Sequence, residues 1–163
     1  MALADGGCLC GELRYQVKSP PSGVTVCHCG FCQKTTGGAY LVEPFFDKSE
    51  FSLTEGNAKV YEHLSEGSGK QVYIHFCDNC GTTLFLTFER FPNDVGIYGG
   101  TFDDPNWYAR SLENSKHIFL GAAQRGTVIP PGVNTFEEHA MTNDGMPIEP
   151  MVFSEPKIIE LPE

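Results

Sequence analysis

The seven cysteines of this chain are the residues whose type and spacing most clearly predict chemistry. They fall into three short groups: Cys8 with Cys10, then Cys27, Cys29 and Cys32, then Cys77 with Cys80. An odd number of cysteines cannot pair completely into disulfides within one chain, and tight clustering is typical of metal ligands. Four thiolates complete the tetrahedral shell of a zinc ion, whereas three leave one position open. Seven cysteines therefore favour two zinc ions, one in a closed site and one in an open site.

The middle group is close enough in sequence to form the open site unaided. If the backbone is extended, Cys27 and Cys29 project from the same face, and Cys32 follows after two more residues. A zinc ion with three thiolates carries a net negative charge, so it should acidify a bound water less than a zinc ion with neutral ligands does. Such a site is better suited to holding a thiol as its thiolate, with polarisation of an aldehyde oxygen as the alternative role.

The other four cysteines are left to form the closed site. Cys8 and Cys10 again stand two residues apart, and an extended backbone would point both sulfurs to one face. Cys77 and Cys80 form a knuckle in which the two intervening residues turn the chain and Gly81 permits a tight backbone approach. A site made by both pairs would link the first strand to the middle of the chain, and its metal-binding energy would also be folding energy.

Other uses of the cysteines fit the sequence less well. A redox Cys-x-x-Cys is typical of a strand-helix-strand pattern, which is missing here. A nucleobase deaminase needs His-x-Glu, and none of the five histidines has Glu two residues later; His-Glu-x-x-His is also absent. Buried cysteines without a ligand are the remaining alternative, but they have no reason to recur in spaced pairs.

Several polar residues near the cysteines have weaker claims to function. His28, between two cysteines, should point away from a metal and pack or make a supporting hydrogen bond, with acid–base work as the alternative. We expect His75 to be a sheet residue and His117 to be structural rather than part of a pocket. Lys34 is expected to be solvated, although it could meet a carboxylate of glutathione.

Alternating apolar residues predict the strands that must position these groups. Leu13, Tyr15 and Val17 face one way while the residues between them face the other. Further strands are expected at residues 23–28, 39–46, 50–53, 58–64, 70–77, 82–88, 94–98 and 117–120, and helical turns only at 30–36 and 104–109. With 18 glycines and 11 prolines, this pattern favours an all-β fold of several antiparallel sheets without crossover helices.

The sequence predicts a single domain over residues 1–163, because it shows no internal repeat, low-complexity segment or break in composition. An acidic extension that contains prolines begins at about residue 137. We expect this extension to be solvated and loosely extended over a sheet edge.

Charge and hydropathy restrict the partners. The formal net charge of −10 would repel phosphate backbones, so we expect no nucleic-acid partner. No apolar run approaches the roughly 18 residues that a membrane-spanning helix needs, so we expect no membrane partner either. The first residues lack the basic head and apolar stretch of a secretory signal, which predicts a cytoplasmic protein with reduced thiols.

Three ordered motifs resemble those of the glutathione-dependent formaldehyde-activating enzyme family. They are Gly7-Cys8-Leu9-Cys10-Gly11 before a strand, Cys27-His28-Cys29 with Cys32 before Gly37-Gly38, and Phe76-Cys77 with Cys80-Gly81-Thr82. The resemblance runs from about residue 6 to about residue 134. It leads us to expect a basic residue at position 33, where this chain has Gln33.

The resemblance implies several antiparallel sheets, a structural zinc and a catalytic zinc. Position by position, the structural-zinc ligands match Cys8, Cys10, Cys77 and Cys80, and the catalytic-zinc ligands match Cys27, Cys29 and Cys32. The implied activity is that of a carbon–sulfur lyase, which makes and breaks bonds between glutathione and formaldehyde. We therefore expect an enzyme whose partners are a small thiol, with glutathione as co-substrate, and a small aldehyde or other electrophile. The alternatives are a zinc-stabilised binding module and a metal or thiol reservoir without turnover.

Overall fold

A computed structural model describes residues 1–160 of the chain. Backbone contacts divide the chain into two compact units, each made of two segments. The first unit comprises Met1–Gly23 and Glu43–Ala109, and the second comprises Val24–Val42 and Arg110–Glu163. The regular structure is mostly β-strand, with one short α-helix and three single-turn helices in the described residues, so the all-β prediction is confirmed. Within the described residues, no helix is long and apolar enough to cross a membrane.

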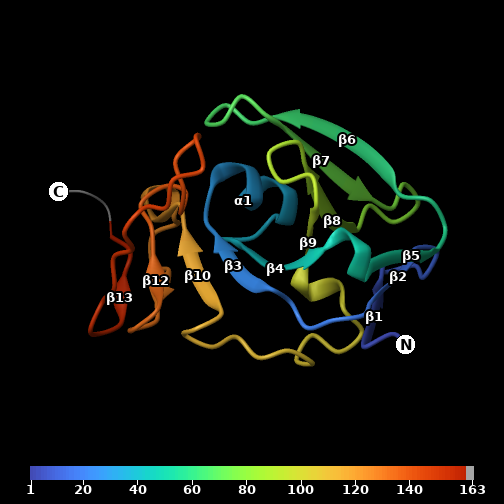
Figure 1. The fold of residues 1–163 in the computed structure, drawn as a ribbon, viewed down its shortest axis with the longest axis horizontal. Helices are drawn as coiled ribbons and strands as arrows, with labels where there is room; N and C mark the ends of the chain where they lie inside the picture. The colour runs from blue at the N-terminus through green and yellow to red at the C-terminus, as the bar shows by residue number, and fades with distance from the viewer. Residues whose placement is uncertain (161–163) are drawn as a thin grey trace. The chain divides into compact units, whose positions relative to one another are not determined.

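The first unit contains two antiparallel sets of strands (Figure 1). The smaller sheet has the order β1-β2-β5, from β1 (Ala4–Gly7), β2 (Arg14–Val17) and β5 (Phe51–Glu55). The larger set has the order β4-β9-β8-β7-β6, from β4 (Leu41–Asp47), β6 (Lys59–Leu64), β7 (Gln71–Phe76), β8 (Thr83–Phe88) and β9 (Asp94–Ile97). Two single-turn helices, η1 (Lys48–Glu50) and η2 (Gly99–Thr101), lie in the connections. This unit therefore follows the antiparallel pattern that the alternating residues predict.

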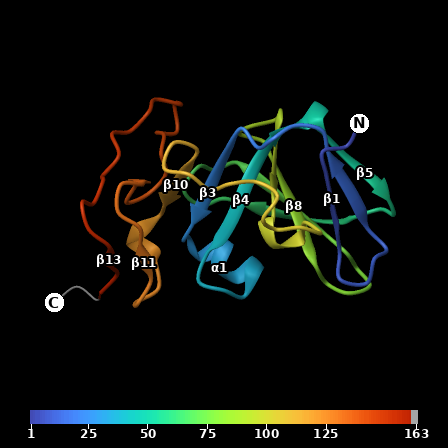
Figure 2. The same cartoon turned by 90° about the horizontal axis from the view of Figure 1, so that it is seen from below.

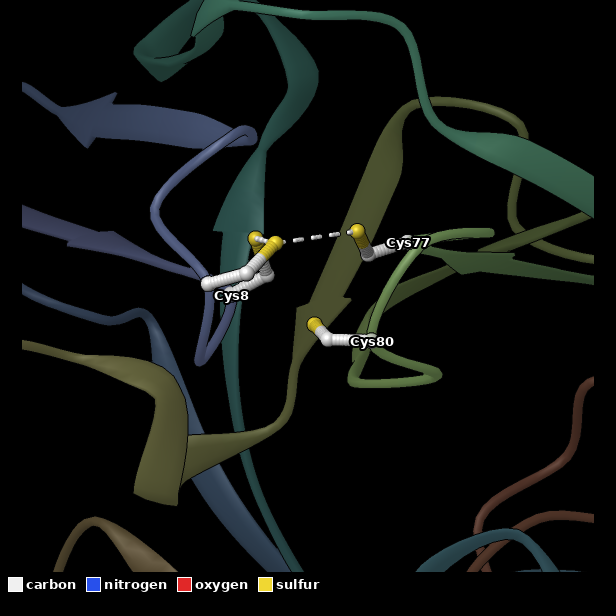
Figure 3. Close-up of side chains that lie close together, drawn as sticks. Cys8, Cys77 and Cys80 are labelled. Atoms are coloured by element: carbon white, nitrogen blue, oxygen red, sulfur yellow. Dashed lines mark hydrogen bonds between the residues drawn. The ribbon is translucent and has the colours of Figure 1, made fainter.

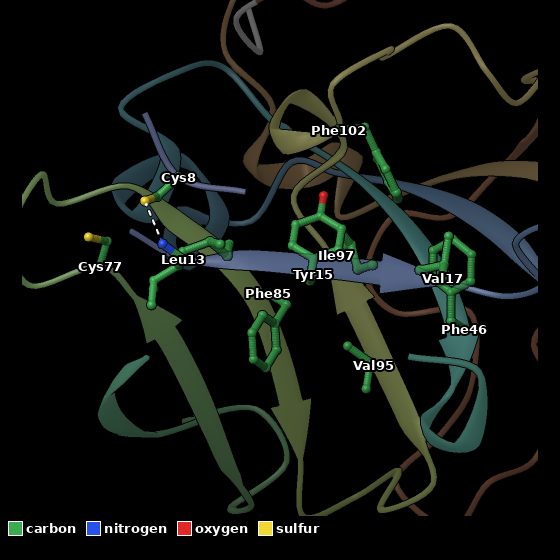
Figure 4. Packing of buried hydrophobic residues seen from close by; sticks show 11 residues of the cluster. Cys8, Leu13, Tyr15, Val17, Phe46, Cys77, Phe85, Val95, Ile97 and Phe102 are labelled. Carbon is green, nitrogen blue, oxygen red and sulfur yellow. Dashed lines mark hydrogen bonds between the residues drawn. The ribbon is translucent and has the colours of Figure 1, made fainter. Parts of the chain in front are cut away.

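The core of the first unit is built from inward-facing strand residues (Figure 4). Tyr15 and Val17, on the predicted inward face of β2, are fully buried. The Tyr15 ring packs edge-on against Phe102, with ring centroids 5.4 Å apart. Cys8 and Cys77 belong to the same buried cluster, so the apolar core surrounds part of the cysteine group. Core packing thus fixes the turns that carry these cysteines.

The second unit has three parallel neighbouring strands and a small antiparallel pair of strands. Strand β10 (Ser115–Ile118) pairs in parallel with both β3 (Gly23–Cys27) and β12 (Asn134–Thr135). The helix α1 (Gly30–Thr36) follows β3 and occupies the predicted residues, and η3 (Leu120–Ala122) follows β10. The parallel pairing of β10 departs from an entirely antiparallel arrangement. The chain returns to β10 through a long excursion, so β10 does not form a hairpin with β3.

The acidic extension is part of the second unit. Strand β13 (Lys157–Ile158) pairs antiparallel with β11 (Val128–Ile129), and Figure 2 shows the two running side by side. Thr135 and Met151 exchange two backbone hydrogen bonds of 2.9 and 2.8 Å. Ile159 packs against a buried cluster. The described part of the extension is mostly exposed and pairs with β12 at the end of a sheet, as predicted. It is not loose, however, because backbone pairing and apolar contacts hold the segment in place.

The predicted helical turn at residues 104–109 is also wrong. The Asp104 side chain accepts a hydrogen bond from the backbone of Asn106 at 2.9 Å, and the Asp104 carbonyl accepts one from the Trp107 backbone at 3.3 Å. Such local bonds from an aspartate compete with helix formation and stabilise a turn. The segment therefore consists of turns and bends.

Candidate metal centres

The first unit brings Cys8, Cys10, Cys77 and Cys80 together. Their sulfur atoms all lie within 4.8 Å of one another. Figure 3 shows Cys8 facing Cys77 and Cys80, which come from a different turn. The Cys10 sulfur lies 3.4 Å from that of Cys8 and 3.7 Å from that of Cys77. The structure therefore gathers the four cysteines that the sequence left for a closed site.

Two turns with special backbone geometry carry this four-cysteine group. Cys8 and Cys10 lie in the turn between β1 and β2 and not in an extended segment, so the predicted alternation does not apply to them. Gly11, with φ of 83°, closes this turn, and its N–H donates to the Cys8 carbonyl at 3.1 Å. In the second turn Gly81, with φ of 75°, donates to the Cys77 carbonyl at 2.8 Å. Glycine tolerates this left-handed conformation, so both turns can close tightly.

Hydrogen bonds from outside the thiols stabilise negative charge in the four-cysteine group. The Leu13 backbone N–H donates to the Cys8 sulfur at 3.2 Å. The hydroxyl of Thr82 lies 3.2 Å from the Cys80 sulfur and also accepts a bond from the Leu9 backbone at 3.1 Å. The hydrogen bond from Thr82 is the largest cause that lowers the pKa of Cys80, to about 5. Thr82 thus connects the two turns, a role that no pattern in the sequence indicates.

The second unit brings Cys27, Cys29 and Cys32 together, again with sulfurs within 4.8 Å of one another. Cys27 ends β3, and Cys29 is the residue that caps the N-terminus of α1. Cys29 has an extended backbone, as predicted, and its sulfur lies 3.5 Å from that of Cys27. The Cys32 backbone N–H donates to the Cys29 sulfur at 3.4 Å. One strand end and one helical turn therefore build the whole three-cysteine group.

The electrostatics of the three-cysteine group favour ionisation at Cys29. Hydrogen bonds from the thiols of Cys27 and Cys32 lower the pKa of Cys29 to about 3. The hydrogen bond to Cys29 is the largest cause that raises the pKa of Cys27. Cys29 is therefore the thiol of this group that ionises most readily, and a thiolate is the form that binds a metal.

His28, between two of these cysteines, is fixed by contacts at both its ring and its backbone. Its side chain is fully buried, and its Nε2 atom lies 3.0 Å from Nδ1 of His117. The His28 ring also packs against Tyr40, with centroids 5.2 Å apart. Its backbone N–H donates to the Ile118 carbonyl at 3.0 Å. This arrangement agrees with a packing and supporting role, while the contact between His28 and His117 carried no signal in the sequence.

The remaining polar candidates lie as follows. His75 is a strand residue in β7, as predicted, and its Nε2 atom lies 2.9 Å from the Thr87 hydroxyl. Lys34 is exposed on α1. Gln33, however, makes an unexpected set of hydrogen bonds, to His28, Ala122 and Gln124.

The donor sets and spacings of both cysteine groups fit a zinc ion. Tetrahedral zinc with bonds of about 2.3 Å to sulfur would separate its sulfurs by about 3.8 Å. The sulfur–sulfur distances of 3.4, 3.5 and 3.7 Å lie close to that value. All seven cysteines are free of disulfides, so every sulfur is available as a ligand. The first unit can therefore offer four sulfur ligands and the second unit three.

The fold and the cysteine groups together define a β-sheet protein whose cysteines form two candidate metal centres. The sequence profile of the family described as "Glutathione-dependent formaldehyde-activating enzyme" matches residues 3–122. The chain belongs to this family. The resemblance drawn from the three cysteine motifs is thereby confirmed.

Individual relatives are similar at modest identity. A protein of Halomonas elongata named "Putative glutathione-dependent formaldehyde-activating enzyme" is 28% identical over 104 residues, which cover 62% of this chain and 66% of the relative. An uncharacterized lyase of Schizosaccharomyces pombe is 23% identical over 110 residues, or 68% of this chain and 71% of the relative. The match thus spans slightly less than two thirds of the first relative's length.

Among solved structures, a crystal structure of a Rhodobacter sphaeroides protein has a similar fold. Its TM-score is 0.50 at 18% sequence identity, and the match covers 61% of this chain and 87% of that protein. At this identity the likeness concerns the fold alone.

Proposed function

We propose that this protein is a zinc-dependent carbon–sulfur lyase that joins or separates a small thiol and a small electrophile at the three-cysteine group. Glutathione is the proposed thiol, and an aldehyde is the proposed electrophile. The protein would use two zinc ions and act on reduced thiols in the cytoplasm. Family membership and the name of the Halomonas elongata relative support the thiol and aldehyde classes.

The single observation that carries this proposal is the unequal division of the cysteines. The first unit gathers four sulfurs, whereas the second gathers only Cys27, Cys29 and Cys32. Four sulfurs leave a zinc ion no position for a substrate, but three leave one. A binding module stabilised by zinc would need only the four-cysteine group, so the second group favours an enzyme.

In the proposed mechanism the three cysteines act mainly by holding negatively charged sulfur ligands at fixed positions. Cys29 enters the site as a thiolate, because its neighbours lower its pKa. Cys27 and Cys32 hold the other two ligand positions, and the end of β3 and the first turn of α1 fix their spacing. When bound there, zinc would supply a position that takes a substrate thiol and favours its ionised form. His28 supports this segment through its contact with His117.

The four-cysteine group has a structural role in this proposal. Cys8 and Cys77 are buried, and the turns that carry them are separated by most of the first unit's sequence. A metal held by both turns would act as a long-range cross-link and stabilise the folded unit. The group would therefore be necessary for folding and would not contact the substrate.

The nature of the electrophile follows from the chemistry. Addition of a thiolate to formaldehyde is already fast in water, so little of its barrier remains for an enzyme to lower. A less reactive aldehyde or another activated electrophile would benefit more from a positioned thiolate. We therefore propose that the substrates include electrophiles less reactive than formaldehyde.

The experiment that tests this function measures carbonyl–thiol exchange by NMR, with and without the two-zinc protein, over several thiols and electrophiles. We expect saturable acceleration that Cys32→Ser abolishes in protein that remains folded by circular dichroism. Cys80→Ser serves as the matched comparison, because it also removes one ligand but should unfold or aggregate the protein. If intact two-zinc protein bound no thiol and Cys32→Ser behaved like the natural protein, the enzyme proposal would fail and the binding module would replace it.

A further inference from the structure

The side chain of Gln33 lies in the middle of a hydrogen-bond network beside the three-cysteine group. Its Nε2 atom donates to the carbonyl of His28 at 2.7 Å and to the carbonyl of Ala122 at 2.8 Å. Its Oε1 atom accepts a hydrogen bond from Nε2 of Gln124 at 3.0 Å. A primary amide has two N–H donors, so both donors of Gln33 are used.

The first of these bonds fixes the peptide that leads into Cys29. The His28 carbonyl belongs to the peptide unit between His28 and Cys29, and Cys29 both joins the three-cysteine group and caps α1. His28 is also held at its backbone N–H by Ile118 and at its ring by His117. Gln33 supplies the remaining restraint, at the carbonyl. Together these contacts leave the segment that carries Cys29 little freedom to rotate.

The second bond, to Ala122, joins Gln33 to η3, which follows a residue with a strained backbone. Ala122 ends η3, and Phe119, which precedes η3, has a left-handed backbone with φ of 61°. A residue with a bulky side chain adopts this conformation only when its surroundings impose it. Here Leu120 is buried in an apolar cluster, and the Phe119 N–H donates to the Glu138 carbonyl at 2.8 Å. Gln33 therefore ties the three-cysteine group to a turn that is already held in place.

We propose that Gln33 is a positioning residue that holds the Cys29 segment against η3 and thereby sets the geometry of the three-cysteine metal site. The inference rests on the proposed function only in assuming that this group binds zinc. The positioning role also explains why position 33 has a neutral amide and not the basic residue that the family resemblance led us to expect. Lysine and arginine have no acceptor, so neither could also accept the bond from Gln124. With both of its N–H donors engaged, Gln33 is not the group that meets a carboxylate of the thiol.

The test compares Gln33→Leu with the natural protein after both have been loaded with cobalt, which reports on ligand geometry through its absorption spectrum. We expect the leucine variant to shift and broaden the bands of the three-cysteine site. It should also lose metal to a chelator from that site faster, because removing the supporting contacts of metal ligands typically weakens metal affinity roughly ten-fold to a hundred-fold. Lys34→Leu is the matched control, because it introduces the same side chain at the next, exposed position of α1. It should leave the spectrum and the release rate unchanged.

A kinetic measurement separates positioning from substrate contact. In metal-saturated protein, Gln33→Leu should leave the ratio of KM for glutathione to KM for 2-mercaptoethanol unchanged, because Gln33 does not touch the thiol. A change in this ratio would mean that Gln33 binds the thiol's charged groups. An unaltered cobalt spectrum and release rate in Gln33→Leu would overturn the positioning role. If instead the natural protein bound no metal at the three-cysteine group, the proposed function itself would fail.

Discussion

At the scale of single residues, the partial burial of His117 should make the stability of the folded chain depend on pH. Burial, with smaller repulsions from His28 and Arg110, lowers the pKa of His117 to about 4. The unfolded chain should titrate near its ordinary pKa of about 6.5. Between these two values the unfolded state binds a proton that the folded state does not. The free energy of unfolding should therefore fall as pH decreases through this window and be fully present above it.

Replacing His117 by glutamine should remove part of this pH dependence, because glutamine keeps a hydrogen-bonding group but does not titrate. We expect the urea midpoint of His117→Gln to fall less between about pH 7 and about pH 5 than that of the natural protein, with excess zinc present in both. Parallel pH profiles for the two proteins would show that partial burial does not keep His117 neutral in the folded state.

Residue types and spacing revealed the cysteines but not the residues that support them. Each cysteine group could be proposed from one sequence because thiols at such spacings have few other uses. Thr82 and Gln33 are common polar residues whose roles depend on contacts with Leu9 and Ala122, far away in the sequence. Contacts of this kind have no local pattern, so the structure was needed to find them.

At the scale of elements, the turn between β7 and β8 depends on the backbone of Gly81. A Cβ atom at this position would meet nothing within 4 Å, but φ is 75°. Gly81→Ala should therefore cost about 1 kcal/mol through backbone strain alone. We expect faster loss of zinc from the four-cysteine group and a lower urea midpoint.

Gly100→Ala is the control for this prediction. A Cβ atom at Gly100 would also meet nothing within 4 Å, and φ is not in the left-handed region. The control should therefore leave zinc release and stability nearly unchanged. Equal effects at both positions would contradict the importance of the left-handed turn.

The acidic extension offers a second test at this scale. Ile159 packs against the buried cluster of the second unit, whereas its neighbour Ile158 is 52% exposed. Ile159→Ala should lower the free energy of unfolding by about 1 to 2 kcal/mol, because it removes a partly buried side chain. Ile158→Ala should have an effect of less than about 0.5 kcal/mol. Equal urea midpoints for both variants would mean that the extension does not stabilise the unit.

Elements with strong local patterns were predictable, and short or weakly patterned ones were not. The alternation at Leu13, Tyr15 and Val17 located β2, and the residues of α1 were predicted as they are. β1 was not predicted, because Ala4–Gly7 has no alternating large apolar residues. β11, β12 and β13 have two residues each, too few for any periodicity. Pairing with distant segments creates these strands, so only the folded chain reveals them.

At the scale of the whole molecule, each compact unit contains one complete cysteine group. Four of the cysteines lie in the first unit and three in the second. Every ligand of a given proposed zinc ion therefore comes from the same unit. A single substitution at either group should affect the metal of its own unit first.

The most direct test of this account is the zinc content of the reduced protein, purified without added metal and measured by native mass spectrometry. We predict two zinc ions per chain, with one retained in Cys32→Ser because the four-cysteine group is complete without Cys32. One zinc ion in the natural protein, or a mass that shows an intramolecular disulfide under non-reducing conditions, would contradict the division into a closed site and an open site.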